Sequence, residues 1–420
     1  MERGIMSKRI LIITQNFYPE IGSAGNRMKN IYLMLKESGY DVEVITTDPT
    51  YPNRNFYEDS SFWDHEELNT TPDITRVKIR NRKYSRSFSN RLIYYLEMAS
   101  KMVKTVLKRS RNYDYVYTTS PPIFVAVVGL VAKFKFRAKL VLEIRDLWPD
   151  SLKGVGVFNN PFIIRLFRRI EKLLYKKADE IVVNSRGFIS HIEGQQETAA
   201  GKVTYVPNAA RLHEVATDTQ SQGQFKAIYA GNLGLAQDNE MLLLLAEELN
   251  KRHVDLTIMG YGYHSQHLKT EIDARCLQNV KFVQPVTRAE CFEIIASHQV
   301  GIVTLVDKEV FKTVLPGKII DYMTCGVPVV GSVDGFAKEV IEEKDAGFVS
   351  QTKDADNLIA YVDRLLNDTL LQRRMSNNAQ QYVKENFLWE KNIHSLLELI
   401  ESEEQEERME INYVRLNFNE

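Results

Sequence analysis

The chain has 420 residues and a net charge of −1, with 44% hydrophobic and 26% charged residues. This length allows two domains of ordinary size, and the composition is that of a folded, water-soluble protein. Three scattered cysteines are too few for a disulfide framework or a zinc site, so we expect reduced thiols and a cytoplasmic location. We find no apolar stretch of about 20 residues and no apolar segment near the start, and therefore expect neither a transmembrane helix nor a signal peptide.

Short apolar runs rich in β-branched residues alternate with helical segments along the chain. We predict strands at 10–14, 42–46, 116–118, 140–144, 181–184 and 203–206, and then at 226–230, 256–259, 280–283, 300–305 and 328–331. Because this alternation is typical of parallel sheets, the sequence predicts two Rossmann-like α/β domains in tandem. We expect a first domain at 1–206, a linker at 207–224, a second domain at 225–387, and a last helix with an acidic tail at 388–420.

The loop that follows the first predicted strand is rich in turn residues. Gly22 and Gly25 in this loop allow backbone N–H groups to approach a ligand, and Arg27 follows them at the start of the next helix. Parallel sheets bind ligands at the carboxyl ends of their strands, where this loop lies. The alternative is a loop that needs glycine only for flexibility. The glycine spacing differs from the dinucleotide fingerprint, which argues against a nicotinamide-dependent dehydrogenase.

The segment from Arg76 to Arg111 holds twelve Lys and Arg and one acid, Glu97. Apolar residues recur among these cations at helical spacing, at Leu92, Leu96, Ala99, Val103 and Leu107. This pattern predicts a basic amphipathic helix that can lie on an anionic membrane, although a solvated outer helix is the alternative. Nucleic acid is a weaker candidate, because the chain as a whole is not basic and has no recognisable nucleic-acid module. A second basic helix is predicted over 160–177, where packing against the sheet explains the apolar residues equally well.

The fourth predicted strand ends in the run Arg145-Asp146-Leu147-Trp148-Pro149. Arg145 cannot act as a base, but it can hold a phosphate or a hydroxyl bidentately, which leaves Asp146 as the carboxylate nearest a reacting hydroxyl. Trp148 and Ser120, which ends the preceding strand, are expected to shape the same wall. The alternative is that Arg145 and Asp146 form a structural pair and Trp148 fills the core of a loop.

The stretch from Leu315 to Asp321 carries the strongest functional signal. Pro316 and Gly317 are typical of a helix start, where free N–H groups and the helix dipole favour a diphosphate, and Lys318 adds a positive charge. Asp321 lies one helical turn further and can accept hydrogen bonds from ribose hydroxyls. The alternative is an ordinary surface helix between two buried strands.

This stretch resembles the signature of the retaining glycosyltransferases of family four, which have the GT-B fold. In that fold, two Rossmann-like domains face each other across a cleft and the C-terminal helix crosses back to the first domain. The second glutamate of the signature falls on Asp321 and the first on Thr313, which carries no charge. The runs at 145–149 and 316–318 are similar to those of a subgroup of capsule and O-antigen transferases, which includes N-acetylfucosamine transferases.

The resemblance implies retaining, metal-independent transfer of a sugar from a nucleoside diphosphate donor to a polyprenyl-linked saccharide. UDP is the nucleoside diphosphate that we expect first. This transfer would take place at the inner face of the cytoplasmic membrane, as a step of capsule, O-antigen or exopolysaccharide synthesis, and would need no cofactor. The residues assigned to catalysis are Lys318, Asp146 and Arg145. Those assigned to the donor are Gly22, Gly25, Asn232, Gly234, Leu315, Pro316, Gly317, Lys318 and Asp321. Those assigned to the acceptor are Arg27, Ser120 and Trp148.

Two other functions stay open. A UDP-sugar 2-epimerase with the GT-B fold would need catalytic carboxylates and a histidine in the cleft and no membrane acceptor, so the basic helix argues against it. A non-catalytic subunit would use the same pocket to bind a nucleotide sugar, and the uncharged Thr313 keeps this alternative in view.

Overall fold

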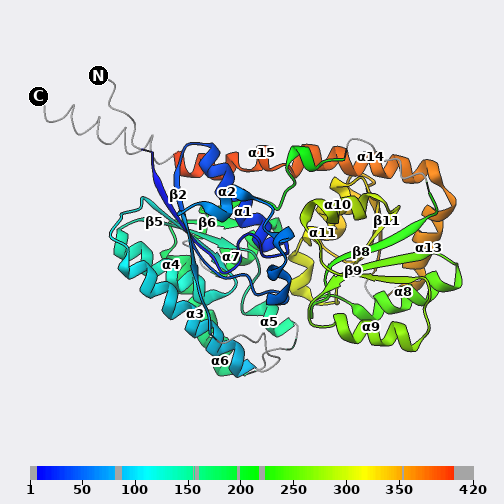
Figure 1. Cartoon of the computed structure of the whole chain (residues 1–420), viewed down its shortest axis with the longest axis horizontal. Helices are drawn as coiled ribbons and strands as arrows, with labels where there is room; N and C mark the ends of the chain where they lie inside the picture. The colour runs from blue at the N-terminus through cyan, green and yellow to red at the C-terminus, as the bar shows by residue number, and fades with distance from the viewer. Residues whose placement is uncertain are drawn as a thin grey trace, which may run out of the picture.

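The computed structural model describes residues 7–80, 88–154, 156, 160–195, 199–216, 223–351 and 354–401. Two sheets form its two halves, which lie side by side in Figure 1. The first sheet has the order β3-β2-β1-β4-β5-β6-β7 and the second β10-β9-β8-β11-β12-β13. Every strand pair between these described strands is parallel. Two parallel-sheet α/β domains are therefore present, as predicted.

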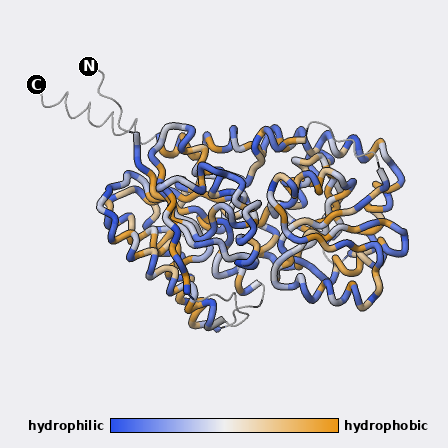
Figure 2. The backbone as a smooth tube through the Cα atoms, viewed as in Figure 1, coloured by the Kyte–Doolittle hydropathy of each residue, from blue (hydrophilic) through white to orange (hydrophobic). Residues whose placement is uncertain are grey.

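The first sheet consists of β1 (Arg9–Ile13), β2 (Asp41–Thr47), β3 (Ile74–Val77), β4 (Tyr115–Ser120), β5 (Lys139–Ile144), β6 (Glu180–Val183) and β7 (Val203–Tyr205). The second consists of β8 (Lys226–Asn232), β9 (Asp255–Tyr261), β10 (Val280–Val283), β11 (Val300–Thr304), β12 (Val329–Ser332) and β13 (Gly347–Ser350). Most of these segments are buried and rich in Val, Ile and Leu, and appear as orange stretches inside both halves in Figure 2. Burial on both faces is what parallel strands require.

Helices cover both sheets. In the first half they are α1 (Ser23–Glu37), α2 (Glu66–Thr70), α3 (Phe88–Lys108), α4 (Ile123–Phe136), α5 (Asp150–Gly154), α6 (Pro161–Lys177) and α7 (Ile189–Gln195). In the second they are α8 (Asn239–Lys251), α9 (Ser265–Ala274), α10 (Arg288–Ala296), α11 (Gly317–Thr324), α12 (Phe336–Glu342), α13 (Ala355–Asn367) and α14 (Thr369–Asn386), followed by α15 (Trp389–Asn392). Local signals start several of them; at α6 the Asn160 side chain accepts hydrogen bonds from two N–H groups and Pro161 follows it.

The C-terminal segment returns to the first domain. Residues 387–388 leave α14, and Ala210 pairs with Leu388 through two hydrogen bonds of 2.9 Å that join Ala210 to Phe387 and Trp389. Trp389 and Ile393 are then buried in the core cluster that also contains Ile10. Figure 1 shows α14 and α15 in one line along the top of both domains. The predicted crossing is confirmed, and the predicted acidic tail lies outside the described residues.

The segment before residue 217 belongs to both cores. Ala209 packs in the first core and Ala210 in the second, so the chain changes domain between these two residues. Part of the predicted linker is thus buried structure, and residues 217–222 lie outside the description.

The apolar face of α3 differs from the predicted one. Tyr94, Met98, Met102 and Val106 are the buried residues, whereas Leu96 and Leu107 from the predicted stripe are 52% and 56% exposed. The buried stripe also follows helical spacing and faces the core shared with α4 and β1. The predicted stripe is thus divided, because Ala99 and Val103 pack against this core while Leu96 and Leu107 point outward.

Candidate active site

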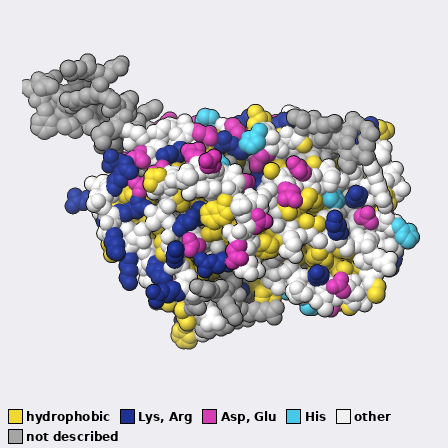
Figure 3. Space-filling view, in the orientation of Figure 1, with side chains coloured by type: hydrophobic (Ala, Val, Ile, Leu, Met, Phe, Trp, Pro, Cys, Tyr) yellow, Lys and Arg dark blue, Asp and Glu magenta, His cyan; other side chains and the backbone are white. Residues whose placement is uncertain are grey.

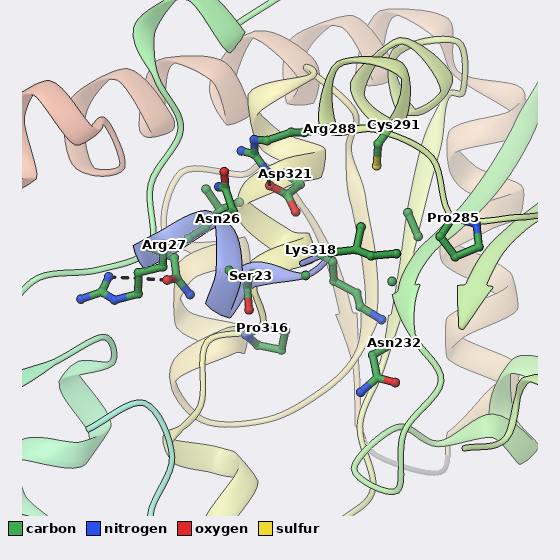
Figure 4. A pocket seen from close by; sticks show the side chains of 18 of the residues that line it. Ser23, Asn26, Arg27, Asn232, Pro285, Arg288, Cys291, Pro316, Lys318 and Asp321 are labelled. Carbon is green, nitrogen blue, oxygen red and sulfur yellow. Dashed lines mark hydrogen bonds and ion pairs between the residues drawn. The ribbon is translucent and has the colours of Figure 1, made fainter. Parts of the chain in front are cut away.

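A cavity of about 530 Å³ lies between the two domains. Its walls come from the loop after β1, the start of α1 and the end of β5 in the first domain, and from the ends of β8 and β9 and the start of α11 in the second. In Figure 4, Ser23 and Arg27 on α1 lie opposite Lys318 and Asp321 on α11. The carboxyl edges of the two parallel sheets thus share one site, as the switch-point rule requires.

Lys318 lies at the first turn of α11, and its ammonium group faces the end of β8. Nζ is 3.7 Å from the centre of the Tyr229 ring and 3.1 Å from Oε1 of Gln237. Burial lowers the pKa of Lys318 to about 7, although Asp321 counteracts this effect. An anionic ligand in the cavity would restore the full charge, because a nearby negative group favours the ammonium form. Lys318 therefore presents to the cavity an ammonium group whose charge depends on its neighbours.

Asp321 lines the cavity one turn beyond Lys318, where it meets a cation that our sequence analysis missed. Nη1 of Arg288 is 3.3 Å from Oδ1 of Asp321, and the same guanidinium pairs with Glu214. Burial raises the pKa of Asp321, while Arg288 is the largest opposing influence. Arg288 begins α10 after the Thr287 N-cap, so its place at a helix start behind a strand was the available signal.

The glycines of the loop after β1 are needed for its geometry. Gly22 has φ 110° and precedes α1, a backbone conformation that side chains rarely adopt. A Cβ on Gly25 would lie 2.3 Å from the carbonyl oxygen of Glu20. Glu20, also missed, lines the cavity with its carboxyl buried, and burial raises its pKa to about 7. The conformation of this loop therefore depends on its two glycines, and the loop forms part of the cavity wall.

The other residues that we assigned to the donor divide into two groups. Asn232, Pro316 and Gly317 line the cavity, whereas Gly234 and Leu315 stand behind its wall. A Cβ on Gly317 would be 3.2 Å from Cβ of Ser23 in the opposite domain, so a small residue keeps the two walls close here.

Arg145 and Asp146 line the first-domain wall. Nη2 of Arg145 donates to the carbonyl oxygen of Pro121 at 2.9 Å, and its Nε lies 3.7 Å from Oε1 of Glu143. Burial raises the pKa of Asp146 to about 6, whereas the nearby Ser151 hydroxyl, the Leu147 N–H and Arg145 lower it. Asp146 is therefore a carboxyl group suited to proton transfer near neutral pH.

Trp148 and Ser120 do not line the cavity. Trp148 packs against Tyr95 and Phe167 in an aromatic cluster with Phe124, which stacks on Tyr95 at 5.5 Å. This placement agrees with the alternative that Trp148 fills a core. Ser120 is 5% exposed at the end of β4.

Arg27, which we assigned to the acceptor, is held by protein groups. Its side chain is 1% exposed and pairs with Glu143 at 2.9 Å, and Nη1 donates to the Pro207 carbonyl at 3.0 Å. The guanidinium also lies 5.5 Å from the ring of Trp389. Arg27 thus joins α1, β5, the segment after β7 and the crossing segment, so part of its role is structural.

Arg27→Ala is expected to lower the free energy of unfolding by about 3 kcal/mol, because the buried Glu143 would lose its nearer cation and keep only Arg145, whose Nε is 3.7 Å away. Urea unfolding followed by tryptophan fluorescence measures this loss. The matched control is Arg9→Ala, which breaks an exposed pair with Asp41 and should cost no more than about 1 kcal/mol. Similar losses in both variants would contradict the assignment.

Thr313 ends the 3₁₀ segment Glu309–Thr313 and contacts the first domain. Ser185 donates to the Thr313 carbonyl, and a Cβ on Gly187 would be 2.6 Å from that same oxygen. Thr313 does not line the cavity. Thr313, at the position of the signature's first glutamate, thus contacts the first domain and does not face the cavity.

Across the described residues, no three His, Cys, Asp or Glu side chains converge as metal ligands would. The chemistry that the site offers lies in a buried ammonium, three carboxyl groups with raised pKa and a helix start. Such a set can bind an anionic leaving group and accept a proton beside it.

The sequence as a whole matches known proteins. The family model "Glycosyl transferase 4-like domain" covers residues 22–209, and "Glycosyl transferases group 1" covers residues 215–382. N-acetyl-alpha-D-glucosaminyl L-malate synthase of Bacillus anthracis is 34% identical over 400 residues, which are 89% of this chain and 92% of that protein. The chain belongs to the group 1 glycosyltransferases.

Two further relatives place this glycosyltransferase more broadly. WcaI of Escherichia coli K12, a glycosyl transferase named for colanic acid biosynthesis, is 25% identical over 291 residues, 65% of this chain and 71% of that one. The solved structure of HepE from Anabaena, in complex with UDP and glucose, has a TM-score of 0.71 at 18% identity and covers 94% of this chain and 100% of that chain. Such structural neighbours confirm the GT-B fold.

Proposed function

We propose that this glycosyltransferase moves a sugar from a UDP-sugar to a saccharide on a polyprenyl carrier, with retention of anomeric configuration. The observation that carries the donor half is Lys318 at the start of α11, facing an interdomain cavity beside Asn232. The HepE structure, which holds UDP and glucose in the same fold, supports a UDP-sugar.

In the proposed reaction, the bond between the sugar and the diphosphate breaks while the acceptor hydroxyl bonds to the sugar on the same face. Lys318 and the N–H groups that open α11 stabilise the negative charge on the departing diphosphate. The proton of the acceptor hydroxyl passes to a leaving-group oxygen, with Asp146 as the protein carboxylate placed to share it. Asp321 holds the ribose, and no metal takes part.

The acceptor half is supported by an exposed apolar surface on the first domain, the α3/α4/α6 face. On α4, Phe124, Val127, Val131 and Phe134 follow helical spacing, and Phe134, which lies between Lys133 and Lys135 in the sequence, is 61% exposed. Exposed apolar side chains continue on both neighbouring helices, at Ile93, Leu96, Leu107, Phe162, Leu166 and Leu173. A contiguous patch of exposed apolar side chains like this one is typical of an interaction surface.

Cations surround this face. In Figure 3, Lys and Arg gather on the side of the molecule where Figure 1 labels α3 and α4. Lys104 and Lys108 are exposed on α3, and the exposed cations of α6 are Arg165, Arg169, Lys172, Lys176 and Lys177. Other cations of the predicted basic segment are used inside the domain, since Arg109 and Arg111 pair with Glu43. Apolar side chains ringed by Lys and Arg suit an anionic membrane surface.

The face also reaches the active-site wall. The aromatic cluster of Tyr95, Phe124, Trp148 and Phe167 joins α3, α4 and α6 to the loop that carries Asp146. None of the described helices is long and apolar enough to cross a membrane. We therefore propose peripheral attachment to the inner face of the cytoplasmic membrane, where a polyprenyl-linked acceptor would meet the cleft, and a role in capsule, O-antigen or exopolysaccharide synthesis.

A Phe134→Glu/Phe162→Glu variant is expected to weaken binding to phosphatidylglycerol vesicles by at least about tenfold, since it replaces two inserting rings by charges that the lipid repels. Vesicle sedimentation measures the change. The matched control is Leu370→Glu, at a 76% exposed leucine on α14 of the other domain. Equal vesicle binding by all three proteins would contradict the proposed membrane surface.

The relative from B. anthracis supports a second candidate, transfer to a small hydroxy acid such as L-malate. Lys29 and Arg145 supply cations on the first-domain wall of the cavity that a small carboxylate would need. The half-buried Lys29 lies 5.8 Å from the ring of Tyr18, and partial burial lowers its pKa. This acceptor would not require the α3/α4/α6 face.

Release of nucleoside diphosphate from a panel of UDP- and GDP-sugars tests the proposal. Each donor is supplied with a polyprenyl-linked saccharide, with L-malate or alone, and each pair is measured with and without EDTA. Release that needs the lipid-linked saccharide and resists EDTA is the expected result. Release only with malate would move the acceptor assignment to the second candidate, and donor binding without any release would favour a non-catalytic subunit.

A further inference from the structure

The amide of Asn232 is enclosed on two sides by glycines of its own domain. A Cβ on Gly262 would lie 2.1 Å from Oδ1 of Asn232, and a Cβ on Gly234 would lie 2.8 Å from Nδ2. Any side chain at either position would therefore displace this amide. The two glycines thus leave room for this amide at the end of β8, where Asn232 is exposed.

A tyrosine from the opposite domain contacts this amide. The hydroxyl of Tyr51, in the loop after β2, donates to Oδ1 of Asn232 at 2.7 Å across the cleft. The Tyr51 ring also meets the ring of Tyr261 edge to face, with centres 5.8 Å apart. Tyr261 in turn faces Gly22, where a Cβ would be 3.2 Å from its hydroxyl oxygen.

The backbone of Tyr51 is itself fixed by the first domain. Its N–H donates to Oε1 of the buried Glu20 at 2.8 Å, and the Thr50 N–H reaches the same oxygen at 3.3 Å. The hydroxyl of Tyr57 donates to the Tyr51 carbonyl. Tyr51 is therefore held in place before a ligand enters, with its hydroxyl donating to Oδ1 of Asn232.

We propose that Tyr51 is a positioning residue that sets the orientation of the Asn232 amide when the two domains are closed. With Oδ1 bound to the Tyr51 hydroxyl, Nδ2 is left to donate to an oxygen of a nucleoside diphosphate. Asn232 and Lys318 lie on the same cavity wall, and Cε of Lys318 would be 3.3 Å from a Cβ on the adjacent Gly231. This inference rests on the proposed function, because it assigns the donor's diphosphate to this wall.

The physical reason is the asymmetry of an amide. An amide presents either two donors or an acceptor, and the two orientations differ by a simple flip. An oxygen turned towards a diphosphate would repel it, whereas N–H groups would bind it. Without the Tyr51 hydroxyl, Asn232 would populate both amide orientations. Donor binding would then have to select one of them, which lowers the affinity for the donor.

Tyr51→Phe removes only the hydroxyl. We expect about a tenfold weaker affinity for UDP and a similar rise in donor KM, the loss of one hydrogen bond, with a smaller change in kcat. Isothermal titration with UDP and with GDP measures binding without turnover. Tyr263→Phe, at a 40% exposed tyrosine, is the control for loss of a phenol group.

A double-mutant cycle separates positioning from a general effect. If Tyr51 acts through Asn232, Tyr51→Phe/Asn232→Ala binds UDP no more weakly than Asn232→Ala alone. Additive losses would overturn the proposal, as would a Tyr51→Phe variant with the affinity of the unaltered protein.

Gly262→Ala supplies a second, independent variant. Its Cβ would strike the Asn232 amide, so UDP affinity should fall by at least as much as in Tyr51→Phe. Gly39→Ala is matched for backbone strain, since both glycines have positive φ, but a Cβ on Gly39 meets no atom within 4 Å. Equal UDP affinity in the two alanine variants would overturn the proposal. Failure of the unaltered protein to bind UDP or GDP would instead overturn the proposed function.

Discussion

Replacing Lys318 by alanine is expected to lower kcat by about 10²- to 10³-fold, the usual cost of removing one preorganised group that stabilises developing charge. The ammonium group is buried against Tyr229 and Gln237, so no water-exposed cation would take its place. Release of UDP under donor saturation measures kcat directly. Because the charge matters most when the diphosphate departs, the fall in kcat should exceed the rise in donor KM.

Two variants sharpen this test. Lys318→Arg keeps a cation and should retain more activity than Lys318→Ala, although the planar guanidinium fits a slot shaped for an ammonium poorly. Lys312→Ala removes a lysine from the same domain that pairs with Glu309 outside the cavity, and should leave kcat unchanged. Unaltered turnover in Lys318→Ala would contradict the assignment of α11 to the active site.

Replacing Asp146 by asparagine is expected to lower kcat by about 10²-fold or more, since it removes a carboxylate that accepts a proton. The raised pKa of about 6 adds a signature in pH. Above pH 6 Asp146 is ionised and can take up a proton; as pH falls through 6 it becomes protonated and activity declines. The plot of kcat against pH should therefore show an acid limb near 6 in the unaltered enzyme and no such limb in Asp146→Asn.

The matched control is Asp150→Asn, four residues further on, whose carboxylate pairs with Arg168 at 2.6 Å. This variant should keep the acid limb. An Asp146→Asn enzyme that retained the limb would show that another group titrates, and Glu20, with its pKa near 7, would be the first to examine.

The sequence predicted the two sheets well because their inner strands are buried on both faces. Every predicted strand is present within two residues at each end, from β1 to β12. The two missed strands, β3 and β13, are four residues long and lie at sheet edges. β3 is only partly buried, and its run Ile74-Thr75-Arg76-Val77 has no continuous apolar stretch. β13 is largely buried, but Gly347-Phe348-Val349-Ser350 holds only two apolar side chains, too few for a strand signal.

The candidate site was predicted in part, and the omissions have a common cause. Lys318 and Asp146 stand at strand ends or helix starts, so topology alone brings them to the cavity. Trp148 also stands there but packs in an aromatic core, whereas Arg27 lines the cavity and is held by protein groups. Which of these outcomes occurs depends on the neighbours of the side chain. Arg288 and Tyr51 act through partners far along the chain, Asp321 and Asn232, and no local pattern indicates such pairs.

The crossing of the C-terminal segment bears on how this protein is made. The core of the first domain includes Trp389, Ile393, Leu396, Leu399 and Ile400. Domains fold as units during synthesis, the N-terminal one usually first. Here the first domain cannot complete its core until residues 389–400 have left the ribosome, whereas the described core residues of the second domain end at Leu388. The half that is translated first is therefore the half that is finished last.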